Sequence, residues 1–293
     1  MLTIFTNVER QCKMLQRAGE YLAVKTLGLP EIRSIYFDDS TAWSKQVSAL
    51  LKASDIVIFL WQGPVYPCEL GDKAWSFLKN EGKTAYAFMS TADTTVNTVS
   101  GFADGELQQI RDYILCSGSS NYQNFLLRLA NKTGRGIWAC QPPQELVWQG
   151  IYHPAAPVAL LATEDYLAAL CPQNRPLVGL LFSRESWIWQ DTAYIDDLIR
   201  ELDARGLDAL PVFGLWEDKQ ALNAAGISQA VERFFYHQGQ VVVSAVINTF
   251  KVGLTLSRQN RPGFLTRLNV PVIQAYNCCI PSASGGKETD SQR

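Results

Sequence analysis

Short apolar runs rich in β-branched residues alternate along the chain with segments whose apolar residues recur every three to four positions. The runs predict strands, and the periodic segments predict amphipathic helices. Regular alternation of the two is typical of α/β domains with parallel sheets. We therefore predict an α/β fold of two tandem Rossmann-like domains with mostly parallel sheets, spanning residues 1–140 and 150–280.

The first predicted domain is a small doubly wound sheet. Strands are expected at residues 2–6, 32–37, 55–61 and 84–90, and helices at 9–25, 69–80 and 101–129, the last interrupted at 117–120. Another helix should open at the polar cluster 38–41, whose side chains suit an N-cap, and run through Lys52. The strand at 55–61 is apolar without alternation, which predicts a central strand buried on both faces.

The second predicted domain repeats this pattern after a stretch rich in Gly, Pro and polar residues at 134–144. Strands are expected at 177–182, 207–213, 241–247 and 270–275, and helices at 193–205 and 227–237. Gly206 suits a left-handed C-cap at the end of the first of these helices. Residues 281–293 contain a single apolar residue and predict a disordered tail.

Composition narrows the class of protein. The 293 residues are 47% hydrophobic and carry a formal net charge of −2, which argues against a nucleic-acid-binding surface. The longest apolar runs fall far short of the ~20 residues of a membrane span, and no basic region precedes an apolar N-terminal stretch. Seven cysteines, an odd number, fit reduced thiols. We expect a cytoplasmic protein.

Common catalytic and metal-binding motifs are absent from the sequence. It has no Gly-x-Gly-x-x-Gly after a strand, no nucleophile elbow, no Cys-x-x-Cys and no His-Glu-x-x-His. The stretch 284–288 resembles part of a phosphate loop but lacks the Ser or Thr after its lysine. The two histidines, His153 and His237, fall in different predicted domains, and the pair Cys278–Cys279 makes at most a weak site for a soft metal. We predict no catalytic residue and no metal ligand.

The segment richest in candidate chemistry follows the predicted strand 177–182, where open α/β sheets bind ligands. Arg184 can bind a carboxylate through two hydrogen bonds, and Trp187 and Trp189 offer flat apolar surfaces. An Asp-Thr pair, Asp191 and Thr192, precedes the next predicted helix. This combination suits a planar ligand with several carboxylates.

A structural interpretation of the same segment uses the same residues. Asp191 or Thr192 would cap the helix, Arg184 would pair with Glu185 or Asp191, and the tryptophans would pack between the domains. The residue types alone leave both interpretations open.

The second half of the chain resembles the N-terminal region of CobN, the large cobaltochelatase subunit, and of the related magnesium-chelatase H subunit. The resembling segments occur in the family's order: 150–154, 178–187, 191–199, 202–213, 242–250 and 269–275. They include a Gly-Tyr-His-Pro-like connector and a strand ending in Asn before a Phe. The first 140 residues fit the family's less distinctive opening domain.

The resemblance implies a subunit that binds a tetrapyrrole, a cobalt-free corrin precursor of cobalamin. An AAA+ ATPase subunit and a subunit with a von Willebrand A-type domain would drive ATP-dependent metal insertion. Cobalt, and ATP with magnesium, would belong to the full complex, with no cofactor on this chain alone. The implied substrate-binding residues are Arg184, Trp187, Trp189, Asp191, Tyr194, His153 and Asn248. Arg184 would contact a carboxylate, the tryptophans the macrocycle face, and Asp191 would position the loop.

Two departures from the family pattern limit what the resemblance implies. Glu185 follows Arg184 where the family has Arg-Ser-His or Arg-Ser-Trp. CobN-like chains also extend far beyond the resembling region, and the part credited with metal insertion is absent here, so the resemblance assigns this chain no catalytic activity of its own. Two alternatives to tetrapyrrole binding within a chelatase follow: a non-catalytic module that docks on the rest of the enzyme, and a free-standing tetrapyrrole carrier.

Overall fold

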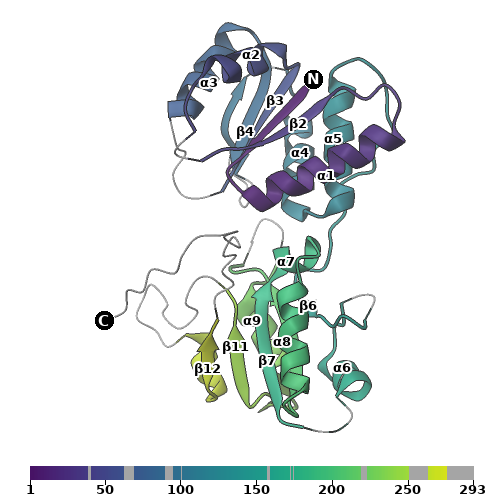
Figure 1. Cartoon of the computed structure of the whole chain (residues 1–293), viewed down its shortest axis with the longest axis vertical. Helices are drawn as coiled ribbons and strands as arrows, with labels where there is room; N and C mark the ends of the chain where they lie inside the picture. The colour runs from purple at the N-terminus through teal and green to yellow at the C-terminus, as the bar shows by residue number, and fades with distance from the viewer. Residues whose placement is uncertain are drawn as a thin grey trace, which may run out of the picture. The chain divides into compact units, whose positions relative to one another are not determined.

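The computed structural model describes residues 1–38, 41–62, 69–89, 95–99, 101–156, 159–171, 173, 175–218, 223–250 and 263–275. The chain divides into two compact units, Met1–Val147 and Trp148–Arg293. Each unit holds a mostly parallel sheet with helices against it (Figure 1). This confirms the predicted fold class, α/β with mostly parallel sheets. The predicted tail at 281–293 and the pair Cys278–Cys279 lie outside the described residues.

The sheet of the first unit has the strand order β2-β1-β3-β4-β5. Its strands are β1 (Leu2–Thr6), β2 (Ile32–Tyr36), β3 (Ile56–Trp61), β4 (Thr84–Met89) and β5 (Thr95–Val99). The first four are parallel, whereas β5, which was not predicted, pairs antiparallel with β4. Every residue of β3 is buried, as the absence of alternation predicted.

Helices cover both faces of this sheet. They are α1 (Glu9–Lys25), α2 (Lys45–Ala53), α3 (Glu69–Asn80), α4 (Asp104–Cys116) and α5 (Ser119–Lys132). Ile4 and Ile58 belong to a core cluster with α1, α4 and α5, while the alternate residues Phe5 and Phe59 belong to a cluster with α2 and α3. The Phe5 and Phe59 rings stack with centroids 4.8 Å apart.

The predicted start of α2 at residues 38–41 is wrong. The helix begins at Lys45, because the hydroxyl of Ser44 accepts a hydrogen bond from the Val47 backbone N–H at 3.2 Å and caps it. Asp38 and Thr41 instead close a turn of their own, in which the Thr41 hydroxyl donates to the Asp38 carboxylate at 3.1 Å. Both sites offer cap-forming side chains, and the later one is used.

Three asparagines of α5 hold the extended segment 138–144 against the first unit. Asn131 bonds both backbone groups of Trp138, at 2.7 and 2.8 Å, and Asn121 bonds the N–H and C=O of Gln144, both at 2.8 Å. Asn124 accepts from the Gln141 N–H at 2.7 Å. These asparagine anchors satisfy backbone groups that have no strand partner.

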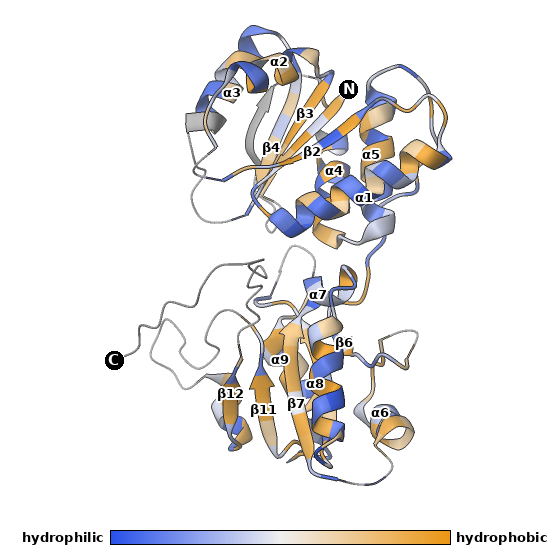
Figure 2. Ribbon diagram, in the orientation of Figure 1, coloured by the Kyte–Doolittle hydropathy of each residue, from blue (hydrophilic) through white to orange (hydrophobic). Residues whose placement is uncertain are grey.

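The sheet of the second unit has the order β12-β11-β7-β8-β6. Its strands are β6 (Gly150–Ile151), β7 (Leu177–Ser183), β8 (Asp208–Gly214), β11 (Ala245–Asn248) and β12 (Val272–Gln274). Only β6 is antiparallel to its neighbour. The helices are α6 (Thr163–Leu170), α7 (Arg184–Ile188), α8 (Ala193–Asp203) and α9 (Ile227–Phe234), followed by a 3₁₀ helix at Phe264–Leu268. Figure 2 shows β7 and β11 mainly hydrophobic and α8 carrying a hydrophilic face.

The predicted strand at 241–247 is right only from Ala245 onward, and the predicted extension of α9 to His237 is wrong. A hairpin intervenes, formed by β9 (Tyr236–His237) and β10 (Gln240–Val241). Gln238 and Gly239 both have positive φ, 49° and 79°, which is the signature of a two-residue type I′ turn. The apolar run 241–247 therefore contributes first to this hairpin and then, from Ala245, to the main sheet.

Among the described residues, no helix combines the length and the hydropathy that crossing a bilayer requires.

Candidate functional site

The second sheet changes direction between β7 and β11. Strand β8 lies on one side of β7 and is reached through α8, whereas β11 lies on the other side and follows α9. The carboxyl ends of β7 and β11 therefore form a topological switch point, where open α/β sheets bind ligands. Residues 183–194 follow β7 directly, and Asn248 ends β11.

The 184–194 segment is a compact turn that leads into α8. The Ser183 hydroxyl accepts from the Glu185 N–H at 3.1 Å and caps α7, and the Glu185 carboxylate in turn accepts from that hydroxyl. Gln190 has a left-handed backbone with φ of 56°, and the Asp191 N–H donates to the Ser186 carbonyl at 2.8 Å. These contacts fix the path of the backbone between the two helices.

Arg184 lies inside this turn. Its side chain is only 2% exposed, and its guanidinium carbon lies 4.0 Å from the centre of the Trp148 ring. At that distance the cation is attracted by the electron-rich face of the indole. The structure thus places the predicted carboxylate-binding residue beneath the surface, stacked on the first residue of the second unit.

The other predicted residues of the segment are less buried. Trp187 is half-buried and stacks on Phe213 of β8, with centroids 4.4 Å apart and planes 8° from parallel. Trp189, Asp191 and Tyr194 are also half-buried, and the Tyr194 hydroxyl donates to Ser186 at 3.3 Å. The structure therefore brings five of the seven predicted residues together in one segment.

Asn248 lies at the switch point but is bonded within the protein. It is 1% exposed, its amide donates to the Gln274 side chain at 2.6 Å, and its carbonyl oxygen accepts from the Phe250 N–H at 3.1 Å. The side-chain amide of Gln274 donates a hydrogen bond to the backbone carbonyl of Phe250 at 2.7 Å. Asn248 therefore shapes the turn after β11 and joins β11 to β12.

His153 lies apart from the other predicted residues. It lines a cavity beneath α8, toward the start of β8, and its ring meets Tyr166 edge-on with centroids 6.0 Å apart. Burial lowers the pKa of His153 below its usual value, although the nearby Asp196 carboxylate acts in the opposite direction. The lowered pKa favours the neutral imidazole.

Trp148, Phe213 and Tyr152 support this region and were missed from the sequence. The first two stack on Arg184 and Trp187. The Tyr152 hydroxyl bonds Thr192 at 2.9 Å and Asp196 at 2.8 Å, and so fastens the start of α8. No local signal marks these contacts, because each joins residues more than 20 positions apart. Only the place of Tyr152 within the 150–154 connector, and of Trp148 just before it, could have drawn attention to them.

The described residues contain no group of three or more His, Cys, Asp or Glu side chains that could hold a metal ion. Chemically, the 184–194 segment offers aromatic surface, the carboxylates of Glu185 and Asp191, and hydroxyl groups. This set suits binding a flat organic molecule rather than bond breaking.

Comparison with known proteins assigns the family. The model of the CobN/magnesium chelatase family matches residues 111–285, more than half of the chain and the whole of the switch-point region. The chain belongs to the CobN/magnesium chelatase family. The match covers α5, the asparagine anchors and nearly all of the second unit, so the family assignment rests chiefly on that part of the molecule.

Three relatives illustrate the family. An uncharacterized protein of Methanocaldococcus jannaschii is 32% identical over 180 residues, which are 58% of this chain and 14% of the relative. The magnesium-chelatase H subunit of Rhodobacter capsulatus is 31% identical over 131 residues, 41% of this chain and 11% of the relative. The aerobic cobaltochelatase subunit CobN of Pseudomonas aeruginosa is 26% identical over 184 residues, 62% and 14% respectively.

A solved structure supports the fold. The catalytic subunit of cobaltochelatase from Mycobacterium tuberculosis matches 94% of this chain and 21% of its own, with a TM-score of 0.55 and 14% identity. The chain thus spans about a seventh of the curated relatives and a fifth of this structural neighbour.

Proposed function

We propose that this chain is the N-terminal part of a CobN-like cobaltochelatase subunit. In this role it binds a tetrapyrrole, a cobalt-free corrin precursor, for ATP-dependent metal insertion in cobalamin biosynthesis. The observation that carries the proposal is the clustering of aromatic and polar side chains at the switch point of the second sheet, within the region that the family model matches.

The half-buried side chains Trp189, Asp191 and Tyr194 are the ones we assign to ligand contact. An indole and a phenol provide flat apolar surface for a macrocycle, and a carboxylate can accept hydrogen bonds from pyrrole N–H or amide groups. Arg184, at 2% exposure, acts in this proposal as a positioning residue that holds the segment against Trp148.

Absorbance titration of a metal-free porphyrin and a cobalt-free corrin with the purified chain tests the proposal. We expect saturable binding at tens of micromolar or below, weakened about tenfold by Trp189→Leu, because one stacked aromatic contributes roughly 1–2 kcal/mol. Trp43→Leu is the matched control, since Trp43 packs on Phe77 in the first unit. Absence of binding, or equal effects of both variants, would overturn the assignment.

At 2% exposure, Arg184 does not present its guanidinium to a substrate carboxylate as the sequence predicted. This weakens the case for tetrapyrrole binding relative to a second candidate, a non-catalytic module that docks on other parts of the chelatase. The partners would be the remainder of the large subunit, the AAA+ ATPase subunit or the subunit with a von Willebrand A-type domain. In that case neither macrocycle binds, while Arg184→Ala weakens capture of a purified partner. Capture and titration together separate the two candidates.

A further inference from the structure

A cavity of about 480 Å³ lies in the second unit and is lined by residues of α6, α8 and the start of β8. Its volume falls in the range of small-molecule sites. The residues lining it come from four separate segments of the chain, and none of them belongs to the 184–194 segment. The lining residues used below are His153, Leu170, Arg175, Asp196, Ile199 and Asp203.

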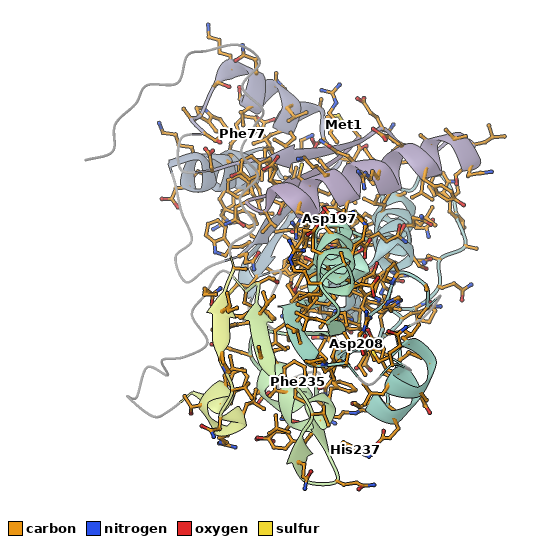
Figure 3. The ribbon with its side chains drawn as sticks, turned by 60° about the horizontal axis from the view of Figure 1, so that its bottom comes forward. Met1, Phe77, Asp197, Asp208, Phe235 and His237 are labelled. Atoms are coloured by element: carbon orange, nitrogen blue, oxygen red, sulfur yellow. The ribbon has the colours of Figure 1, made fainter. Side chains whose placement is uncertain are left out.

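The floor of the cavity is held rigidly by an ion-pair network. Arg175 donates to Asp208 at 2.6 and 2.9 Å and to the Asp203 carboxylate at 2.7 Å. The hydroxyl of Tyr166 donates to the Ala209 carbonyl at 2.7 Å, which fixes the aromatic wall. Figure 3 labels Asp208, one of the two carboxylates that Arg175 binds. Because these side chains are held in place, the cavity has a defined shape without a ligand.

The charges around the cavity are unequal. Three carboxylates line the cavity, those of Asp196, Asp203 and Asp208, against two guanidinium groups. Arg175 is paired with Asp203 and Asp208, and Arg200 is paired with Asp197 at 2.8 Å. Among the described residues, the Asp196 carboxylate accepts a hydrogen bond only from the Tyr152 hydroxyl, at 2.8 Å. The lining is therefore negative overall and favours a cation.

His153 adds a hydrogen-bond donor beside that carboxylate. Its Nδ1 accepts from the Ala155 N–H at 3.1 Å, so the neutral ring carries its proton on Nε2. Nε2 has no partner among the residues that the structure describes. Burial lowers the pKa of His153, which favours the uncharged ring.

We propose that this cavity is a binding site for a small organic cation in which an ammonium group and a hydrogen-bond acceptor, such as a hydroxyl or amide oxygen, share a short aliphatic stem. The ammonium is bound by Asp196, and the acceptor by Nε2 of His153. The stem lies on Leu170 and Ile199. The site is separate from the one proposed for the tetrapyrrole and does not depend on it.

Histidine NMR tests this site directly, because the chain has two histidines and only His153 lines the cavity. The probes are 3-amino-1-propanol, propylamine without the acceptor, 1-propanol without the cation, and propionate with the opposite charge. Signals are assigned with His153→Gln and His237→Gln. We expect 3-amino-1-propanol to shift the His153 imidazole signals saturably and to leave those of His237 in place.

Asp196→Asn should weaken this binding about tenfold, because an ionic hydrogen bond becomes a neutral one. Glu201→Gln removes the same charge from α8 outside the cavity and should leave the affinity unchanged. Unshifted far-UV circular dichroism confirms that both variants fold. Lack of a His153 shift with 3-amino-1-propanol, an equal shift with propionate, or full affinity in Asp196→Asn would overturn the proposal.

Discussion

The guanidinium of Arg184 stacks on the indole of Trp148, with 4.0 Å between the guanidinium carbon and the ring centre. The two residues lie 36 positions apart, one at the start of the second unit and the other directly after β7. The contact therefore joins the 150–154 connector region to the switch-point segment. It gives a buried arginine a structural role within the second unit.

A double-mutant cycle between Arg184 and Trp148 should show coupling. With Arg184→Met and Trp148→Leu, we expect an interaction energy of about 0.5–2 kcal/mol in the free energy of unfolding, as for a desolvated cation–π pair. Urea titration followed by circular dichroism measures it. The exposed ion pair between Arg200 and Asp197 is the control, and its interaction energy should be only about 0.2–0.5 kcal/mol. Additive effects at Arg184 and Trp148 would contradict the assigned contact.

Phe213 supports Trp187 and is fully buried. We expect Phe213→Ala to cost about 3–5 kcal/mol of unfolding free energy, through lost burial and the cavity left behind. Phe213→Leu keeps most of the apolar volume and should cost less, chiefly the ring stacking of about 0.5–1.5 kcal/mol. Chemical denaturation compares the two variants. Equal costs would contradict this, because they would mean that the apolar volume retained by Leu contributes nothing.

Gly179, in the middle of β7, is needed for the close approach of Phe235. An added Cβ would lie 2.4 and 2.7 Å from two carbons of that ring. Gly179→Ala should therefore destabilise by about 1–3 kcal/mol, and Phe235→Leu should reduce that penalty in the double variant. Gly206→Ala is the control, because its cost comes from a φ of +74° in open space. Phe235→Leu should not reduce the destabilisation caused by Gly206→Ala. The midpoint of thermal unfolding measures both double variants.

The half-buried His153 should make stability depend on pH. Its folded-state pKa is lowered by burial, so below about pH 6.5 the unfolded chain binds a proton that the folded chain resists. Stability should therefore fall as pH drops from 6.5 toward the lowered pKa. His153→Gln should flatten this part of the profile. Urea midpoints between pH 7.5 and 5 measure it, and an unchanged slope in the variant would contradict the burial of the ring.

Asn121 should matter more than Asn124, because it satisfies two backbone groups of Gln144 rather than one of Gln141. We expect Asn121→Ala to lower the unfolding free energy by about 1–3 kcal/mol and to accelerate hydrogen exchange at the Gln144 amide. Asn124→Ala should affect the Gln141 amide and leave that of Gln144 protected. Loss of protection at both sites in either variant would mean that the segment detaches as a whole.

The fold could be predicted wherever a local sequence pattern determines the type and the bounds of a helix or strand. The strand 2–6 and the helix 9–25 match to the residue, and the buried run 55–61 differs by one. The hairpin at 236–241 could not be predicted, because nothing in the apolar run 241–247 separates it into two short strands. The one sequence signal for the hairpin is Gly239, which readily adopts the left-handed backbone of the Gln238–Gly239 turn.

The candidate site was predictable as a segment but not as a set of contacts. The position after β7 follows from the strand pattern, and the structure puts five predicted residues there. The burial of Arg184 depends on Trp148, and the bonds of Asn248 depend on Gln274 in a neighbouring strand. Such partners are set by strand order, which composition does not encode.

The asparagine anchors also decide where the chain can be divided. A boundary drawn from regular secondary structure would fall after Lys132, at the end of α5. A fragment ending there would lack Trp138, which packs against the core of the first unit, and would leave the amides of three asparagines facing water. A fragment made to express the first unit alone should therefore extend through Val147, so that it includes the proline-containing segment 138–144.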